Sequence, residues 1–195
     1  MHTAADIMIS GKLLQAMHFA AHKHRDQRRK DPRGTPYINH PLDVAHILWF
    51  EGEVHDIDVL TAAILHDTVE DTDTTMDEIE LAFGHAVARY VEEVTDDTSL
   101  SRHERKAAQL AKAAEISHGA KLIKLGDKIS NLRDIARSTP VGWTPGRCRN
   151  YFEWAAGVVN QMRGTNAGLE RVVDRVYHQF LDHFAEDLAK DPVGR

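Results

Sequence analysis

Helical periodicity runs through almost the whole chain and restricts it to an all-α fold. Apolar residues recur at intervals of three and four, as Leu13, Met17 and Ala20 do near the start. No alternating strand pattern is sustained, and no Asn-Gly or Asp-Gly pair marks a hairpin turn. We expect the first helix to end by Pro32. Further helices are expected at 41–51, 57–70, 75–95, 102–115, 118–136, 146–163 and 165–188.

Length and composition fit one domain. A chain of 195 residues with 42% hydrophobic side chains can bury a substantial core, and no linker, repeat or low-complexity run divides it. We therefore assign residues 1–195 to a single domain with a core at about 12–185, without further domains. The single cysteine, Cys148, excludes a disulfide within the chain. Because residues 1–19 lack a long apolar run, we expect a cytoplasmic protein that does not enter a membrane.

The charges are distributed unevenly. Residues 22–33 hold six Lys or Arg against two acids, although the whole chain has a net charge of −6. Residues 66–80 hold seven acids and no Lys or Arg. A small basic patch on an acidic protein suits a compact polyphosphate better than duplex nucleic acid, which requires a broad basic face. We predict a small-molecule partner and no nucleic acid.

Residues 59–71 combine a buried helix with a cluster of ionisable groups. Leu60, Ala63, Ile64 and Asp67 follow helical spacing, so a carboxylate interrupts the stripe that should face the core. A buried carboxylate requires compensation, and a divalent cation shared with the adjacent His66 would provide it. Glu70 and Asp71 follow within one further helical turn, and they are expected on the same surface.

Two more candidate ligands lie elsewhere in the chain. Pro41 should push His40 out of helical geometry and hold its imidazole at a rigid corner. Asp127 interrupts the apolar helix at 118–136 and shares a face with Asn131. Together His40, His66, Asp67 and Asp127 offer two imidazoles and two carboxylates. This set suits Mn²⁺, Fe²⁺ or Zn²⁺ better than a hard oxygen-only site.

The order of these four residues resembles the metal-binding signature of the HD-domain phosphohydrolases. The flanking words HRDQRRKD at 24–31, GTPYINHP at 34–41 and LHDTVEDT at 65–72 resemble the hydrolase domain of RelA/SpoT-type alarmone enzymes. The resemblance covers about residues 12–185, and 195 residues leave no room for a synthetase or regulatory domain. The chain is most similar to the stand-alone small alarmone hydrolases of the metazoan SpoT-homologue type. The implied fold is an all-α HD-domain bundle.

The resemblance implies hydrolysis of the 3′-diphosphate of guanosine tetra- or pentaphosphate, giving GDP or GTP and pyrophosphate. By this resemblance His40, His66, Asp67 and Asp127 would bind one Mn²⁺, which would acidify a water molecule. Glu70 and Asp71 would orient and deprotonate that water, with Glu70 as the general base. The same comparison implies these substrate contacts: Arg25, Arg28, Arg29, Lys30, Arg102, Asn131 and Tyr151.

Three alternatives remain open at this point. The same site could serve as an NADPH 2′-phosphatase or act on another nucleotide phosphate. A non-catalytic alarmone-binding module is a second class, although every expected ligand and both Glu70 and Asp71 are present. A purely structural scaffold would leave the buried acids without a cause. The oligomeric state is not predicted.

Two residues depart from the family's pattern in the segment KLIKLGDKISNL at 121–132. Gly126 replaces alanine, which would cost up to about 1 kcal/mol of helix propensity. Ser130 replaces tyrosine. We expect neither to touch a metal ligand. The other histidines lack the surrounding motif and are interpreted as surface or core residues, and Phe152 and Trp154 as packing residues.

Overall fold

The computed structural model describes residues 4–190, with side chains for residues 11–182. Within this part the chain is all-α, as predicted, and its only extended pairing is an isolated bridge between Arg28 and Pro36. The limits of the single domain, 1–195, stay a prediction. The helices are α1 (Ala4–Lys23), α2 (Asn39–Phe50), α3 (Ile57–Leu65), α4 (Thr68–Asp71), α5 (Met76–Phe83), α6 (His85–Val94), α7 (Arg102–Lys112), α8 (His118–Arg137), α9 (Pro145–Asn160) and α10 (Ala167–Lys190).

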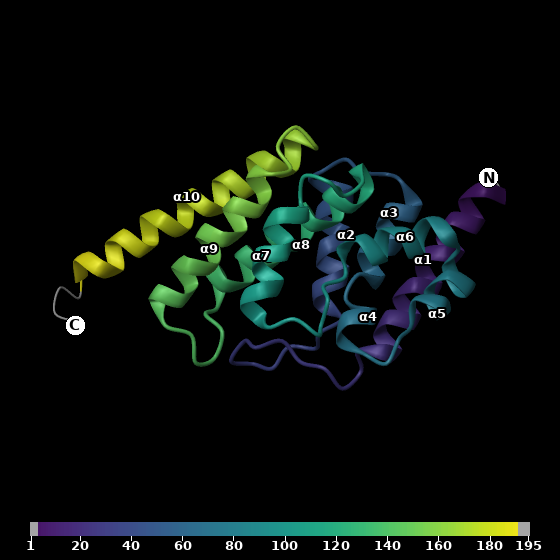
Figure 1. Cartoon of the computed structure of the whole chain (residues 1–195), viewed down its shortest axis with the longest axis horizontal. Helices are drawn as coiled ribbons and strands as arrows, with labels where there is room; N and C mark the ends of the chain where they lie inside the picture. The colour runs from purple at the N-terminus through teal and green to yellow at the C-terminus, as the bar shows by residue number, and fades with distance from the viewer. Residues whose placement is uncertain (1–3, 191–195) are drawn as a thin grey trace.

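Helix α8 forms the centre of the core. It packs against α2, α3, α6, α9 and α10, and Figure 1 shows it enclosed between these elements. Its side chains Ile123, Leu125, Ile129 and Leu132 are fully buried. A Cβ atom at Gly126 would lie 3.1 Å from Cγ1 of Val44 and 3.2 Å from Cδ2 of Leu48. The glycine therefore allows α2 and α8 to approach closely, a packing role that a helix-propensity argument does not reveal.

The helix predicted at 57–70 is interrupted. Helix α3 ends at Leu65, and α4 begins at Thr68, so His66 and Asp67 occupy the turn between them. Two side chains bind backbone oxygens of the preceding turn: Nδ1 of His66 lies 2.8 Å from the oxygen of Ala63, and the Thr68 hydroxyl donates to Leu65. Such bonds compete with the helical pattern and reorient the chain. The assumed continuous helix face beyond Asp67 is therefore wrong.

The predicted geometry of His40 is also wrong, since α2 begins at Asn39 and includes His40 in its first turn. Pro41 fits the same turn because backbone N–H groups there have no helical acceptor. The helix predicted at 75–95 divides at Gly84, whose φ of 89° favours glycine. Thr144 caps the start of α9, and Thr75 caps the start of α5.

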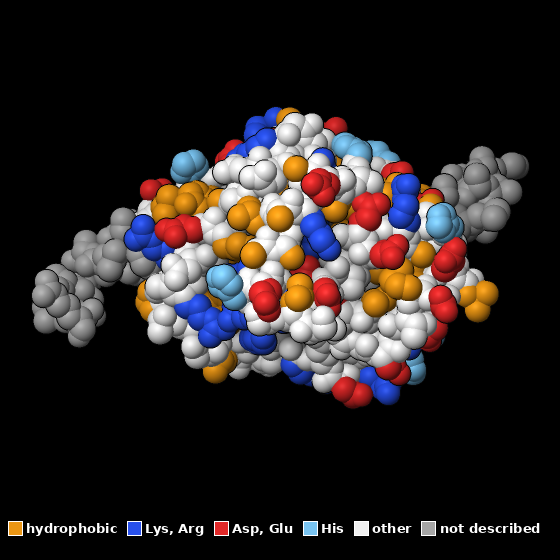
Figure 2. Space-filling model, in the orientation of Figure 1, with side chains coloured by type: hydrophobic (Ala, Val, Ile, Leu, Met, Phe, Trp, Pro, Cys, Tyr) orange, Lys and Arg blue, Asp and Glu red, His pale blue; other side chains and the backbone are white. Residues whose placement is uncertain are grey.

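The segment between α1 and α2 forms a long loop at residues 24–38. It runs along the lower edge of the molecule in Figure 1, below α4 on one side and beside the segment before α9 on the other. The amide of Val141 donates to the carbonyl oxygen of Lys30 at 2.8 Å, which joins the two segments. On the face drawn in Figure 2, acidic side chains gather on the right, and Lys and Arg side chains gather at the lower left. None of the described helices has an apolar stretch long enough to cross a bilayer.

Candidate active site

The four predicted metal ligands converge from three parts of the fold. Helix α2 supplies His40, the turn after α3 supplies His66 and Asp67, and α8 supplies Asp127. Donor atoms of His40, His66 and Asp67 lie within 4.8 Å of one another. Asp127 directs Oδ1 at both rings, 3.3 Å from Nε2 of His40 and 3.9 Å from Nε2 of His66. All four side chains are largely buried.

The imidazoles are oriented as metal ligands usually are. Nδ1 of His66 is bound to the backbone oxygen of Ala63, and Nδ1 of His40 lies 3.0 Å from the Ser130 hydroxyl. Both rings therefore present Nε2 to the shared centre. Nε2 of His66 is buried without a hydrogen-bond partner, although an oxygen of Asp67 lies 3.1 Å away in poor geometry. This orphaned nitrogen, beside two carboxylates, fits a divalent cation.

Electrostatics keep the two aspartates ionised. Burial opposes the charge of Asp67, but His66 and then His40 hold its pKa well below the usual range. Burial likewise opposes the charge of Asp127, and Lys128 followed by His40 lowers its pKa. The Tyr37 hydroxyl donates to Oδ2 of Asp67 at 2.6 Å. Because burial and the Asp67 charge raise the pKa of Tyr37, this hydroxyl remains a neutral donor.

Glu70 and Asp71 lie on α4 at the rim of the centre. The backbone amide of Asp96 donates to Oε2 of Glu70 at 3.2 Å, and Nη1 of Arg105 lies 3.6 Å from Oε1. Burial, followed by the charge of Asp96, raises the pKa of Glu70 to about 7. A carboxylate with this pKa accepts and returns protons near neutral pH. Asp71 instead accepts a hydrogen bond of 2.8 Å from Nε2 of Gln27.

A cavity of about 350 Å³ brings together most of the predicted substrate contacts. Nη2 of Arg29 donates to Oδ1 of Asn131 and to Oδ2 of Asp134, each at 2.8 Å. Asn131 also donates to Oδ1 of Asp127 at 2.5 Å, which connects the cavity to the metal centre. The predicted residues in the cavity wall are Arg28, Arg29, Lys30, Asp71, Arg102, Asn131 and Tyr151.

Arg25 is the predicted contact that the structure does not bring into this cavity. Its Nη1 donates to the backbone oxygen of His22, and its Nε lies 3.3 Å from Asp26. The side chain is exposed beyond the end of α1. The motif placed Arg25 correctly in the basic segment, but it did not reveal the direction of the side chain.

Several residues of the site were missed by the sequence reasoning. Trp143 lines the cavity and contacts two guanidinium groups, Arg147 at 4.3 Å and Arg102 at 5.7 Å from the ring centroid. A tryptophan in the short loop between Pro140 and Pro145 is the available signal in the sequence. Trp154, predicted to pack, also lies beneath the ammonium groups of Lys106 and Lys128, at 4.5 and 4.6 Å. Planar rings beside cations suit a base and its phosphates.

One correction and one further contact concern residues near the expected ligands. Ser130 was expected to touch no ligand, yet its hydroxyl is the partner of His40. Gln27 orients Asp71 and is itself held by the buried His24, whose Nδ1 lies 2.6 Å from Oε1 of Gln27. Both contacts join residues whose relation depends on tertiary packing or on loop conformation.

An all-α fold with two imidazoles and two carboxylates at its centre defines an HD-domain protein. The profile of the HD domain family matches residues 16–142, and the chain belongs to this family. It is 58% identical to guanosine-3′,5′-bis(diphosphate) 3′-pyrophosphohydrolase MESH1 of Mus musculus, over 87% of this chain and 95% of that protein. The MESH1 protein of Drosophila melanogaster is 51% identical over the same shares.

A solved structure extends the comparison to three dimensions. It is described as a metazoan orthologue of SpoT that hydrolyses ppGpp and plays a role in starvation responses. The TM-score is 0.84 at 51% identity, over 86% of this chain and 94% of the other. The predicted resemblance to the RelA/SpoT-type hydrolases is therefore confirmed.

Proposed function

We propose that this protein hydrolyses the 3′-diphosphate of guanosine tetra- or pentaphosphate and releases pyrophosphate with GDP or GTP. The observation that carries this proposal is the juxtaposition of the His40, His66, Asp67 and Asp127 cluster with the cationic, aromatic cavity around Arg29 and Trp143. The names of the similar pyrophosphohydrolases support it. A cytoplasmic location belongs to the same proposal.

The cluster would hold one divalent cation, which we propose to be Mn²⁺. Two imidazole nitrogens with two carboxylates suit this ion among the first-row metals. When bound, the ion supplies positive charge that polarises the phosphate and acidifies a water molecule. Tyr37 and Ser130 keep Asp67 and His40 in place through the hydrogen bonds described above.

The protein's own residues divide the remaining work. Glu70 takes the proton of the attacking water, because its carboxylate lies at the rim with a pKa of about 7. Asp71, fixed by Gln27, orients the same water. Arg29 and Lys30 bind the nucleotide, with Arg28, Arg102, Asn131 and Tyr151 in the same cavity wall. Water adds to the phosphorus bonded to the ribose 3′-oxygen, and this oxygen leaves with a proton.

The test is pyrophosphate release from guanosine tetraphosphate by metal-stripped protein, with and without added Mn²⁺. Turnover that requires a divalent cation and is greatest with Mn²⁺ is expected. The same protein is incubated with NADPH, and inorganic phosphate is measured. Metal-loaded protein that leaves guanosine tetraphosphate intact but dephosphorylates NADPH would replace the proposed substrate. Inactivity toward both would refute hydrolysis of either compound.

A further inference from the structure

A chain of hydrogen bonds through Asp96, Gln109 and Lys128 links Glu70 to Asp127. The backbone amide of Asp96 donates to Glu70 at 3.2 Å, and the Asp96 carboxylate accepts from Nε2 of Gln109. Oε1 of Gln109 accepts from Nζ of Lys128 at 3.0 Å, and Lys128 donates to Oδ2 of Asp127 at 2.9 Å. The expected base and an expected metal ligand are thus joined through the loop after α6, helix α7 and helix α8.

Asp96 is the branching point of this chain. Its side chain is 14% exposed, and Nζ of the largely buried Lys124 lies 3.8 Å from Oδ1. Lys124 also donates to the backbone oxygen of Val94 at 2.7 Å, so its ammonium group is shared between two acceptors. Asp96 therefore places a largely buried negative charge close to Glu70, to which its own backbone amide donates. Gln109 fixes the direction of that carboxylate.

Charged groups face Glu70 from three elements. Asp67 and Asp71 belong to its own segment, Asp96 lies in the loop after α6, and Arg105 projects from α7. After burial, Asp96 has the largest effect in raising the pKa of Glu70, ahead of Asp67 and Asp71. Its backbone amide acts in the opposite direction and favours the ionised form. One residue thus both fixes the carboxylate and opposes its ionisation.

We propose that Asp96 is a positioning residue for the hydrolysis, holding Glu70 by its backbone amide and strengthening Glu70 as a base by its carboxylate charge. Gln109 maintains this arrangement by bridging Asp96 to Lys128. Asp96 acts through Glu70, and neither Asp96 nor Gln109 is required to touch the substrate. The inference rests on the proposed role of Glu70.

Asp96→Asn isolates the charge, because asparagine keeps the backbone amide and an oxygen that can accept from Gln109. The acid limb of the pH profile of kcat/KM is expected to move down by about one pH unit. The plateau value of kcat should fall severalfold, since the weaker base accepts the proton less readily. Metal content and KM should remain those of the wild type.

A second readout does not depend on turnover. The ¹³C resonance of the Glu70 carboxyl carbon, assigned by its loss in Glu70→Gln, is followed against pH in metal-free and metal-loaded protein. Its midpoint should be lower in Asp96→Asn than in wild type in both forms. If the wild type hydrolyses neither nucleotide, the proposed function fails, but this titration still decides the effect of Asp96 on Glu70.

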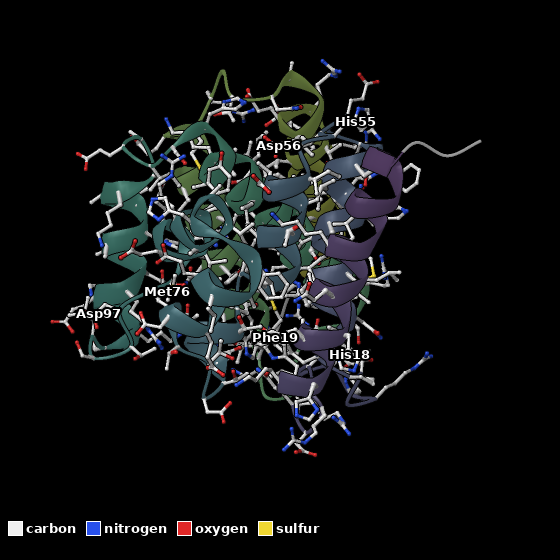
Figure 3. The ribbon with its side chains drawn as sticks, turned by 90° about the vertical axis from the view of Figure 1, so that its right-hand side faces the viewer. His18, Phe19, His55, Asp56, Met76 and Asp97 are labelled. Carbon is white, nitrogen blue, oxygen red and sulfur yellow. The ribbon has the colours of Figure 1, made fainter. Side chains whose placement is uncertain are left out.

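Asp97→Asn is the matched control. Asp97 is exposed at the edge of the molecule (Figure 3), where its carboxylate accepts from the backbone and hydroxyl of Ser99. Removal of this neighbouring charge should leave both the profile and the resonance unchanged. An unshifted midpoint in folded Asp96→Asn, or an equal shift in Asp97→Asn, would overturn the proposal.

Gln109→Met tests the bridge if Asp96→Asn does not fold. It removes both hydrogen bonds of the amide without changing any charge. A severalfold loss of kcat with normal metal content is expected, together with a shifted Glu70 midpoint. Wild-type values of both would exclude the bridging role.

Discussion

Asp67 and Glu70 are separated by only two residues, yet they occupy opposite electrostatic surroundings. The Tyr37 hydroxyl donates to Oδ2 of Asp67 at 2.6 Å, and Nε2 of His66 lies 3.1 Å from the same oxygen. Glu70 faces the acid Asp96, and burial with this charge raises its pKa to about 7. The comparison teaches that neighbouring carboxylates acquire different chemistry from the elements packed against each of them.

The surroundings come from separate parts of the chain. Helices α2 and α8 and the loop at 24–38 enclose Asp67, whereas the loop after α6 and helix α7 enclose Glu70. A buried carboxylate beside two imidazole nitrogens is suited to hold a cation. A half-buried acid beside another acid is suited to accept a proton. Replacements around Asp67 should therefore impair metal binding, and replacements around Glu70 should impair proton transfer.

The largest effect is expected from loss of Asp67 or Asp127, the two carboxylates of the expected metal site. Asp67→Asn and Asp127→Asn should each remove the bound metal and reduce turnover roughly a thousandfold or more, because the ion's charge is lost. Metal content of the purified variants, measured by mass spectrometry, checks this expectation. Wild-type metal content in either variant would remove that residue from the ligand set.

The two metal-side variants should differ in stability. Asp127 neutralises the buried Lys128 at 2.9 Å, so its replacement leaves this ammonium group in the core with only neutral partners in contact, Gln109 and the Trp154 ring. Asp127→Asn should lower the free energy of unfolding by about 3 kcal/mol. Denaturant unfolding of metal-free protein measures this difference, with Asp67→Asn as the comparison.

Glu70→Gln should impair proton transfer and leave metal binding unchanged. Turnover is expected to fall by roughly a hundred- to ten-thousandfold, because the general base is lost, while metal content stays that of the wild type. Steady-state kinetics and metal analysis of the same preparation provide the check. Near-normal kcat would exclude Glu70 as the base.

The pH profile sharpens the same prediction. Glu70 must be deprotonated to act, so wild-type kcat/KM should fall about tenfold per unit as the pH drops below about 7. The residual activity of Glu70→Gln should lack this limb. A limb retained in the variant would assign the titration to another group.

The cluster of His40, His66, Asp67 and Asp127 was predictable from the sequence to a greater degree than the surroundings of Glu70. His66 and Asp67 are adjacent, and a buried helix that ends in ionisable groups is a local signal. Asp127 could be added because it interrupts an apolar helix. His40 was chosen from its place before Pro41, although the helical geometry assumed there proved wrong. The break after Leu65 was missed, since bonds from His66 and Thr68 to backbone oxygens are not encoded in periodicity.

The surroundings of Glu70 depend on contacts that no local pattern reveals. Asp96 meets Glu70 across 26 positions, and Arg105 comes from yet another helix. Trp143 joins Arg102 from a distant turn. Such pairs arise only when the helices pack, so the sequence identified Glu70 as a candidate without predicting its basicity.

Arg29→Ala tests whether substrate binding is separable from metal binding and from proton transfer. Arg29 is held by Asn131 and Asp134 in the wall of the cavity that also contains Trp143. Loss of its charge-assisted contacts should raise KM about thirtyfold with normal metal content. Arg25→Ala, outside the cavity, should change KM less than about twofold, within the usual range for exposed charges. Equal effects of the two variants would contradict this division.

The smallest effect is expected at Ser130, whose hydroxyl contacts the expected metal ligand His40. Ser130→Ala removes the partner of Nδ1 of His40, which leaves the ring free to rotate or change tautomer. Metal affinity should fall about tenfold, the lower end of what loss of such a partner costs. Titration of metal-stripped protein with Mn²⁺ by calorimetry measures the change.

Ser117→Ala is the matched control for this hydroxyl. Ser117 caps the same helix at its other end, where its side chain accepts from the amide of Ala120. Its loss should lower stability by about 1 kcal/mol and leave Mn²⁺ affinity unchanged. If both serine variants weaken Mn²⁺ binding equally, the effect of Ser130 acts through the stability of α8. If only Ser130→Ala weakens Mn²⁺ binding, the loss of affinity results from the changed orientation of His40. Ser130 then belongs with the surroundings of Asp67 and not with those of Glu70.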